Sequence, residues 1–118
     1  METILLDSDW VLVQGDERIP LPMEILGGAA DRKLTFERVF SLEATDFCVR
    51  YRLHIDQLPE GASVYIGDLC IDEGAVGSLD TDVTDCLTLD DNRLIIHLLH
   101  GGAVSGIRLL QIACDENP

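Results

Sequence analysis

Residues 47–55, with the sequence FCVRYRLHI, alternate between apolar and polar side chains. Successive side chains of a β-strand point to opposite faces of a sheet, so this run predicts a strand that is buried on one face. The side chains expected on the core face are Phe47, Val49, Tyr51, Leu53 and Ile55. The opposite face carries Cys48, Arg50, Arg52 and His54. Apolar residues at helical spacing are hard to find elsewhere in the chain, which favours an all-β fold.

Short alternating or β-branched runs recur along the sequence and are separated by Gly, Pro, Asp and Asn, a pattern typical of an antiparallel sandwich or barrel. The predicted strands are residues 10–14, 34–42, 47–55, 63–66, 69–72, 94–99 and 107–113. Trp10 and Tyr51 are interpreted as core residues.

Turn and cap residues separate these strands. Gly67 and Asp68 predict a two-residue hairpin, because Gly accepts the positive φ that such a turn requires. Residues 82–87 (DVTDCL) predict a strand end followed by one helical turn, whose exposed amides Thr84 or Asp85 can cap. Further turns are expected at residues 58–61 and 90–92, and an extended loop at Pro20, Pro22 and Gly27-Gly28.

The predicted strand at residues 94–99 has large aliphatic side chains on both faces. Leu94, Ile96 and Leu98 point toward the core, whereas Ile95 and Leu99 point the other way. Exposed apolar patches usually mark a contact surface. Ile95 and Leu99 are therefore candidates for an interface in a homodimer or with a protein partner.

Length and charge limit the possible partners. A chain of 118 residues is large enough for one core and too small for two ordinary domains, so residues 1–118 are expected to form a single β-sandwich domain.

The chain has 22 acidic and 8 basic residues, with Lys33 as its single lysine. This charge repels phosphate backbones and anionic lipids, which argues against nucleic acid and membranes as partners.

The N-terminal residues lack the basic segment of a signal peptide, and no apolar run reaches the roughly 18 residues of a transmembrane helix, which predicts a cytoplasmic protein. The four cysteines contain no Cys-x-x-Cys pair, so buried free thiols are expected. Disulfides are the alternative if the chain is an exported one that has lost a signal sequence. The cysteines are Cys48, Cys70, Cys86 and Cys114.

Five segments, in order along the chain, are similar to one known family. Residues 34–42 have aromatic residues four apart followed by a leucine, and residues 63–68 resemble a V-x-V-N-G hairpin with Gly-Asp in place of Asn-Gly. Residues 82–87 and 92–96 are similar to D-V-T-D-x-L followed by N-x-L-x-V, and residues 106–112 to a closing G-I strand. In this order they resemble the N-terminal sugar-binding domain of family-two glycoside hydrolases, a jelly-roll β-sandwich of the galactose-binding-domain-like type.

The resemblance implies a carbohydrate-binding accessory module without catalytic activity, because in those hydrolases the catalytic carboxylates belong to a separate barrel domain. Consistent with this, the sequence has no Gly-x-Ser-x-Gly motif. No cofactor is expected. The resemblance leaves a structural calcium ion as an alternative, with the acidic ligands Asp80, Asp82, Asp85, Asp90 and Asp91. His97 and His100 face opposite sides of a strand and do not predict a zinc site.

Arg50, Arg52 and His54 are the candidate ligand-binding residues. They place much of a scarce positive charge on one strand face, and their planar donors suit carboxylates or sugar hydroxyl groups. The alternative is structural, in which these residues pair across strands with acids such as Glu37. Carbohydrate modules usually add aromatic platforms, and here Trp10, Tyr51 and Tyr65 are the aromatic residues considered for this role.

Two functions therefore remain open. The first is a non-catalytic module that binds carbohydrate through Arg50, Arg52 and His54. The second is a scaffold that forms a homodimer or binds a protein through Ile95 and Leu99 and has no sugar ligand.

Overall fold

The structure is a computed structural model that describes residues 2–6, 9–20, 33–99 and 102–114, without the side chains of residues 73–76. Its strands are β1 (Glu2–Leu5), β2 (Val11–Gln14), β3 (Glu17–Pro20), β4 (Leu34–Phe40), β5 (Val49–Ile66), β6 (Leu69–Asp82), β7 (Asn92–Leu98) and β8 (Ser105–Ala113). One 3-10 turn, η1 (Thr84–Cys86), lies between β6 and β7. Within the described ranges, no helix has the length and apolar character needed to cross a membrane.

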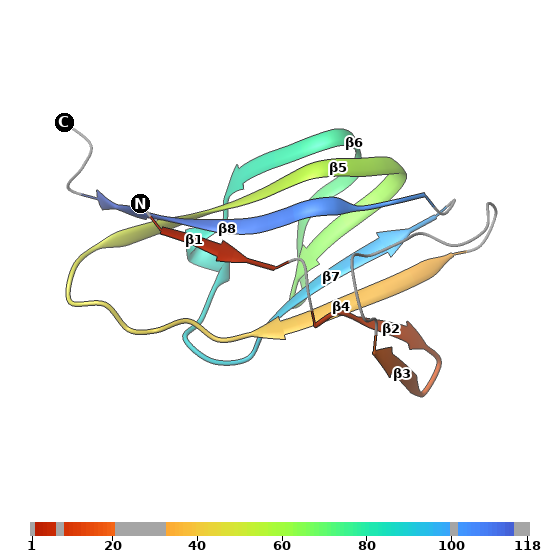
Figure 1. The fold of residues 1–118 in the computed structure, drawn as a ribbon, viewed down its shortest axis with the longest axis horizontal. Helices are drawn as coiled ribbons and strands as arrows, with labels where there is room; N and C mark the ends of the chain where they lie inside the picture. The colour runs from red at the N-terminus through yellow and green to blue at the C-terminus, as the bar shows by residue number, and fades with distance from the viewer. Residues whose placement is uncertain (1, 7–8, 21–32, 100–101, 115–118) are drawn as a thin grey trace.

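The strands form a curled antiparallel sheet that folds into two layers, and β5 belongs to both (Figure 1). Residues 49–57 of β5 pair with β8, which in turn pairs with β1. Residues 62–66 pair with β7, and the layer continues through β4 and β2 to β3. The hairpin partner β6 follows β5 along its length. This arrangement confirms the predicted β-sandwich.

The predicted turn at residues 58–61 is wrong, because the chain bends there without reversing. The β5–β6 register shifts between Ile55 and Leu58 and again between Leu58 and Ala62, so residues 58–61 form an irregular stretch within one strand. Pro59 has no backbone N–H, and Gly61 has a φ of 83°. Both properties interrupt the regular hydrogen bonding between β5 and β6, which allows β5 to pass from one layer to the other.

The Gly67 hairpin is confirmed. Gly67 has a φ of 59°, and Ile66 pairs with Leu69 across the turn. Gly15, with a φ of 58°, joins β2 to β3 in the same way. This second Gly-Asp turn was not predicted from the sequence, and Pro20 was expected in an extended loop. Pro20 instead ends β3, an edge strand whose outer side needs no N–H donor.

Other boundaries also differ from the prediction. β1 was not predicted, and β6 extends to Asp82 where the sequence pattern predicted an end at residue 72. Of the expected extended loop, Pro22 and Gly27-Gly28 lie outside the described residues. Apart from Leu79, residues 77–82 of β6 have small or acidic side chains, so the sequence lacks the sustained hydrophobic alternation that identifies a strand.

The core lies between the two layers, and its composition confirms the faces predicted for β5 and β7. Trp10 and Ile55 are fully buried, and Tyr51 is nearly so. Phe47 is an exception, since more than half of its side-chain surface is exposed just before β5 begins. The largest fully buried side chains are Trp10, Phe36, Leu6, Leu53, Ile55, Leu94, Ile96, Leu98, Ile107, Leu109 and Val64.

The expectation of buried free thiols is wrong for three of the four cysteines. Cys48 and Cys114 form a disulfide, because they flank the first β5–β8 residue pair and their Cα atoms are 5.3 Å apart. The backbone N–H of Cys114 also donates to the carbonyl of Cys48. Cys70 is free and exposed, and Cys86 is free and half-buried.

Candidate functional site

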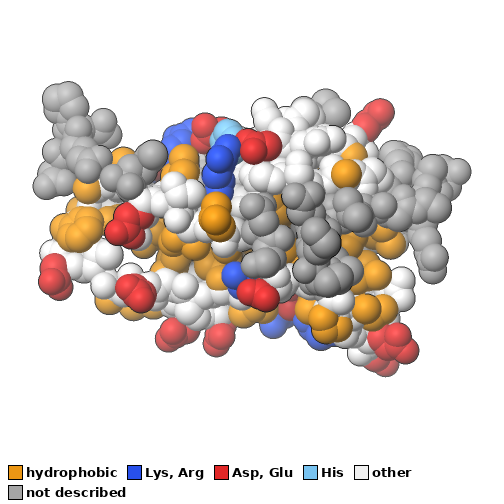
Figure 2. Space-filling model, in the orientation of Figure 1, with side chains coloured by type: hydrophobic (Ala, Val, Ile, Leu, Met, Phe, Trp, Pro, Cys, Tyr) orange, Lys and Arg blue, Asp and Glu red, His pale blue; other side chains and the backbone are white. Residues whose placement is uncertain are grey.

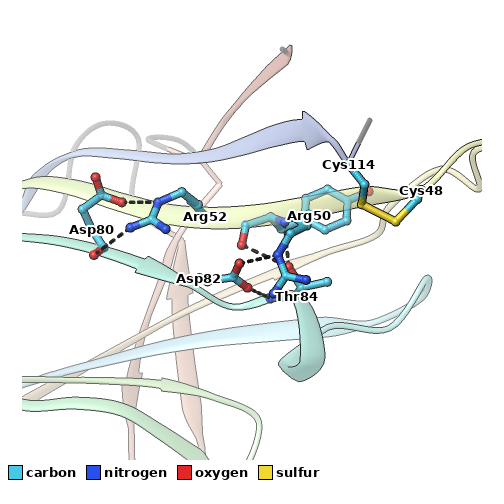
Figure 3. A network of polar contacts seen from close by, with 8 residues as sticks. Cys48, Arg50, Arg52, Asp80, Asp82, Thr84 and Cys114 are labelled. Atoms are coloured by element: carbon cyan, nitrogen blue, oxygen red, sulfur yellow. Dashed lines mark hydrogen bonds and ion pairs between the residues drawn. A yellow bond between two sulfur atoms is a disulfide. The ribbon is translucent and has the colours of Figure 1, made fainter. Parts of the chain in front are cut away.

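The predicted residues Arg50, Arg52 and His54 lie side by side on the outer face of β5, and each is paired with an acid. Arg50 Nε donates to Asp82 Oδ2 at 2.8 Å, and Arg52 Nε donates to Asp80 Oδ1 at 2.8 Å (Figure 3). Both acids come from the neighbouring strand β6. The cross-strand register places Arg52 opposite Asp82 and His54 opposite Asp80, so each arginine reaches its acid diagonally.

The row continues onto β8 through Asp56. His54 Nε2 lies 2.8 Å from Asp56 Oδ1, and Arg108 Nη2 donates to the same oxygen at 2.7 Å. Gly106 makes this approach feasible, since a Cβ at that position would lie 2.2 Å from the Asp56 carboxylate. Arg108 and Asp56 were not predicted as site residues. The signal available for Arg108 was a single charge within the apolar run at residues 107–110.

We call this surface the arginine face. Its members are Arg50, Arg52, His54, Asp56, Asp80, Asp82 and Arg108. It joins three guanidinium groups to three carboxylates and carries no net charge when His54 is neutral. Figure 2 shows acidic and basic side chains packed together, with a histidine among them, at the upper edge of the molecule where Figure 1 places β5 and β6.

Two acids of the arginine face, Asp56 and Asp82, are held in the ionised form. The hydrogen bond from Arg50 is the main cause that lowers the pKa of Asp82 to about 2, and a backbone hydrogen bond from Thr84 adds to it. The same pair raises the pKa of Arg50. The hydrogen bond from His54 is the main cause of the lowered pKa of Asp56. The Asp56 and Asp82 carboxylates are therefore acceptors at neutral pH and poor proton donors.

The Asp-Val-Thr-Asp segment positions Asp82. The predicted helical turn is present as η1, but its capping residues were wrongly assigned, because Asp82 accepts the hydrogen bond from the Thr84 N–H at 3.0 Å. The Thr84 hydroxyl oxygen instead accepts from the Tyr51 N–H at 2.8 Å. This corner therefore ties the end of β6 to β5 and fixes the carboxylate beside Arg50.

A shallow hollow of about 370 Å³ lies beside this row. It is lined by Thr3, His54, Asp80, Arg108 and Leu110. The volume falls within the range of small-ligand sites. The paired groups can offer fixed donors and acceptors to a polar ligand, and the apolar part of the lining comes from Leu110.

Glu37 is not a partner of the predicted site. It is buried on the outer side of β4, where Arg18 Nη1 lies 2.6 Å and Arg93 Nε 3.3 Å from Glu37 Oε1. Arg50 and Arg52 take their acids from β6 instead. The cross-strand pairing expected as the structural alternative is thus present with other acids, and ligand binding by Arg50, Arg52 and His54 stays a prediction.

The acidic residues considered for calcium do not form a cation site. In the part of the chain that the structure describes, no group of three His, Cys, Asp or Glu residues is arranged to hold a metal ion. Asp80 and Asp82 already accept hydrogen bonds from arginines. Of the histidines considered for zinc, His97 belongs to β7 and His100 lies outside the described residues.

The candidate interface residues lie on the outer face of the other layer. Leu99 is 50% exposed just after β7, whereas Ile95 is half-buried and pairs with Tyr65 of β5 and with Glu37 of β4. The His97 ring, which points to the same side as Ile95, meets Tyr65 edge to face. This face thus combines apolar and aromatic side chains, in contrast to the arginine face.

The fold has counterparts among solved structures. No protein-family model and no curated protein sequence matches the chain. A FMN-binding beta-glucuronidase from Facaelibacterium prausnitzii L2-6 is similar at a TM-score of 0.73 and 18% identity, over 93% of this chain and 22% of the enzyme. Bacteroides uniformis beta-glucuronidase 2 gives 0.74 and 15%, over 93% of this chain and 18% of the enzyme.

A glycosyl hydrolase family 2 member from Bacteroides cellulosilyticus gives a TM-score of 0.68 at 12% identity, over 96% of this chain and 20% of that protein. The chain thus spans about a fifth of the length of these enzymes. At this identity the likeness establishes the fold. It confirms the resemblance inferred from the five segments: the chain has the fold of a domain of family-two glycoside hydrolases.

Proposed function

We propose that this chain is a non-catalytic binding module that recognises carbohydrate hydroxyl groups through the arginine face. The observation that carries the proposal is the row of three arginine–aspartate pairs beside a hollow of about 370 Å³. Sugar hydroxyls both donate and accept hydrogen bonds. Guanidinium groups and carboxylates held side by side supply both partners in fixed positions, which lowers the entropy cost of binding.

The charge balance of this face favours an uncharged ligand. The three carboxylates offset the three guanidinium groups, so the face has no net charge that would favour a charged ligand over a neutral sugar. The similar structures are beta-glucuronidases and a glycosyl hydrolase, which is in keeping with a carbohydrate ligand.

The ionisation of the acids supports a binding role over a catalytic one. A general acid in a glycosidase needs a carboxyl group whose pKa is raised. The pKa of Asp56 and that of Asp82 are lowered by their partners. We therefore assign these groups to hydrogen bonding with the ligand.

The proposal is tested by screening labelled protein on a glycan array, with and without calcium. The wild type is expected to give saturable binding that Arg52→Ala abolishes. Arg93→Ala is the matched control, because it removes an exposed, acid-paired arginine from the other layer. Absence of binding to any glycan, or equal binding by the Arg52 variant, would overturn the proposal.

A second candidate function is a homodimer or scaffold formed through Ile95 and Leu99. The half-exposed Leu99 beside the aromatic pair of β5 and β7 favours it. Sedimentation equilibrium would then show a wild-type dimer and a folded, monomeric Leu99→Glu variant. A wild type that stays monomeric at high concentration would remove this candidate.

A further inference from the structure

A second hollow, of about 330 Å³, lies on the outer face where β5 pairs with β7. We call it the Tyr65 hollow. Its described lining is Lys33, Gly61, Ser63, Tyr65, His97 and Leu99. It belongs to the layer opposite the arginine face and shares no residue with it, so a ligand here is independent of the carbohydrate binding proposed for the arginine face.

Two rings form a rigid wall of the Tyr65 hollow. The centroids of Tyr65 and His97 are 5.4 Å apart with an interplanar angle of 76°. His97 Nδ1 lies 2.9 Å from the Thr35 hydroxyl oxygen, which fixes the imidazole in its plane. Leu99 adds an apolar surface that is half exposed. An aromatic face beside an aliphatic side chain suits the apolar face of a ring-shaped ligand.

The charge of this hollow is opposite to that of the molecule. The chain carries a net charge of −14, yet none of the described lining residues is acidic. Lys33, the single lysine, supplies an exposed ammonium group. Burial, followed by the nearby charge of Lys33, lowers the pKa of His97, so the imidazole is neutral at pH 7. Among the described residues of the lining, Lys33 is therefore the charged group.

We propose that the Tyr65 hollow binds a small carboxylic acid whose ring lies against Tyr65 and Leu99 and whose carboxylate pairs with Lys33. The Ser63 hydroxyl and the His97 imidazole are the neutral polar groups that orient the ligand. Both a carboxylated sugar and an aromatic acid have this chemistry, and the experiment distinguishes the two sources.

The experiment is a titration of the whole chain followed by amide chemical shifts. Galacturonate and benzoate are the acidic probes, and galactose and benzyl alcohol are their neutral counterparts. At least one acid is expected to shift the amides of residues 63–65 and 97–99, with roughly tenfold weaker binding of its neutral counterpart, because a charge-assisted hydrogen bond is lost. Response to galacturonate identifies the sugar source, and response to benzoate the aromatic one. If neither acid shifts these amides, or if the neutral compounds bind equally well, the proposal is overturned.

Matched variants separate the contributions of charge and ring. Lys33→Gln is expected to weaken binding of the acid about tenfold, whereas Lys33→Arg keeps it. Tyr65→Ala is expected to abolish binding, whereas Tyr65→Phe retains the ring and most of the affinity. The amide spectrum of each variant checks that it is folded. A folded Lys33→Gln variant with wild-type affinity would overturn the assignment of the carboxylate.

Discussion

Arg50, Arg52 and Arg108 each lie within 2.8 Å of a carboxylate, whereas Lys33 lines a hollow whose described lining contains no acid. The two sites lie on opposite layers, and β5 contributes to both because it bends at residues 58–61. The comparison shows that net charge describes neither face of this acidic chain. The arginine face is internally balanced, whereas the described lining of the Tyr65 hollow combines apolar and neutral polar side chains with the cation Lys33.

The largest effect is expected from the disulfide, which belongs to the layer of the arginine face. Replacing Cys48 and Cys114 with Ala should lower the free energy of unfolding by about 4 kcal/mol, because the bridge closes a loop with a sequence separation of 66 residues. Urea denaturation measures the loss. Hydrogen exchange should show that β8 loses more protection than β4, and equal loss in both layers would contradict a local role.

A smaller effect distinguishes the inner and outer faces of β7. Ile96→Ala should cost about 3 kcal/mol, because Ile96 is fully buried between the layers. Ile95→Ala on the outer face serves as the matched control and should cost about 1 kcal/mol or less. Chemical denaturation of the two variants checks this difference, and similar losses would mean that both faces of β7 are covered in solution.

Glu37 is the buried charge of the layer that carries the Tyr65 hollow. Glu37→Gln should destabilise the fold by about 1 kcal/mol, since the variant keeps an acceptor for Arg18 and Arg93 but loses two ion pairs with half-exposed arginines. Thermal unfolding at low and high salt measures this cost. An unchanged melting temperature would show that these pairs contribute nothing.

The smallest effect is the pH dependence from Asp82. Its pKa of about 2 in the folded protein lies below the ordinary 3.8, so its contribution is present above about pH 4 and is lost as the pH falls toward 2. The pair is partly exposed, and solvent screening keeps this contribution below about 1 kcal/mol. Urea unfolding of wild type and Asp82→Asn should show a difference at pH 5 that vanishes near pH 2. A difference that grows on acidification would contradict the pairing with Arg50.

The sequence predicted those parts of the fold whose signal is local. The alternation at residues 47–55 placed Leu53 and Ile55 in the core, and Gly67 gave the hairpin. The bend at residues 58–61 was wrongly predicted as a reversal, because Pro and Gly break a ladder in the same way in a turn and in a bent strand. Whether a turn or a bent strand forms depends on the pairing of β5 with β8 and β7, which are distant in the sequence.

The candidate sites show the same limit. The position of Arg50, Arg52 and His54 on one face followed from a period of two, but their acids followed from the β5–β6 register, which alternation does not give. The disulfide was missed for the same reason, since Cys48 and Cys114 meet only when β5 pairs with β8. The Tyr65 hollow joins residues from three segments, and the sequence had no local signal for it.

The most direct test of the different roles of the two faces is an amide chemical-shift map of the wild type during titration with a neutral oligosaccharide selected on the array. The account predicts saturable shifts at residues 50–54, 80–82 and 108, with residues 63–65 and 97–99 unaffected. Shifts confined to the Tyr65 hollow, or no shifts at saturating sugar, would contradict carbohydrate binding at the arginine face.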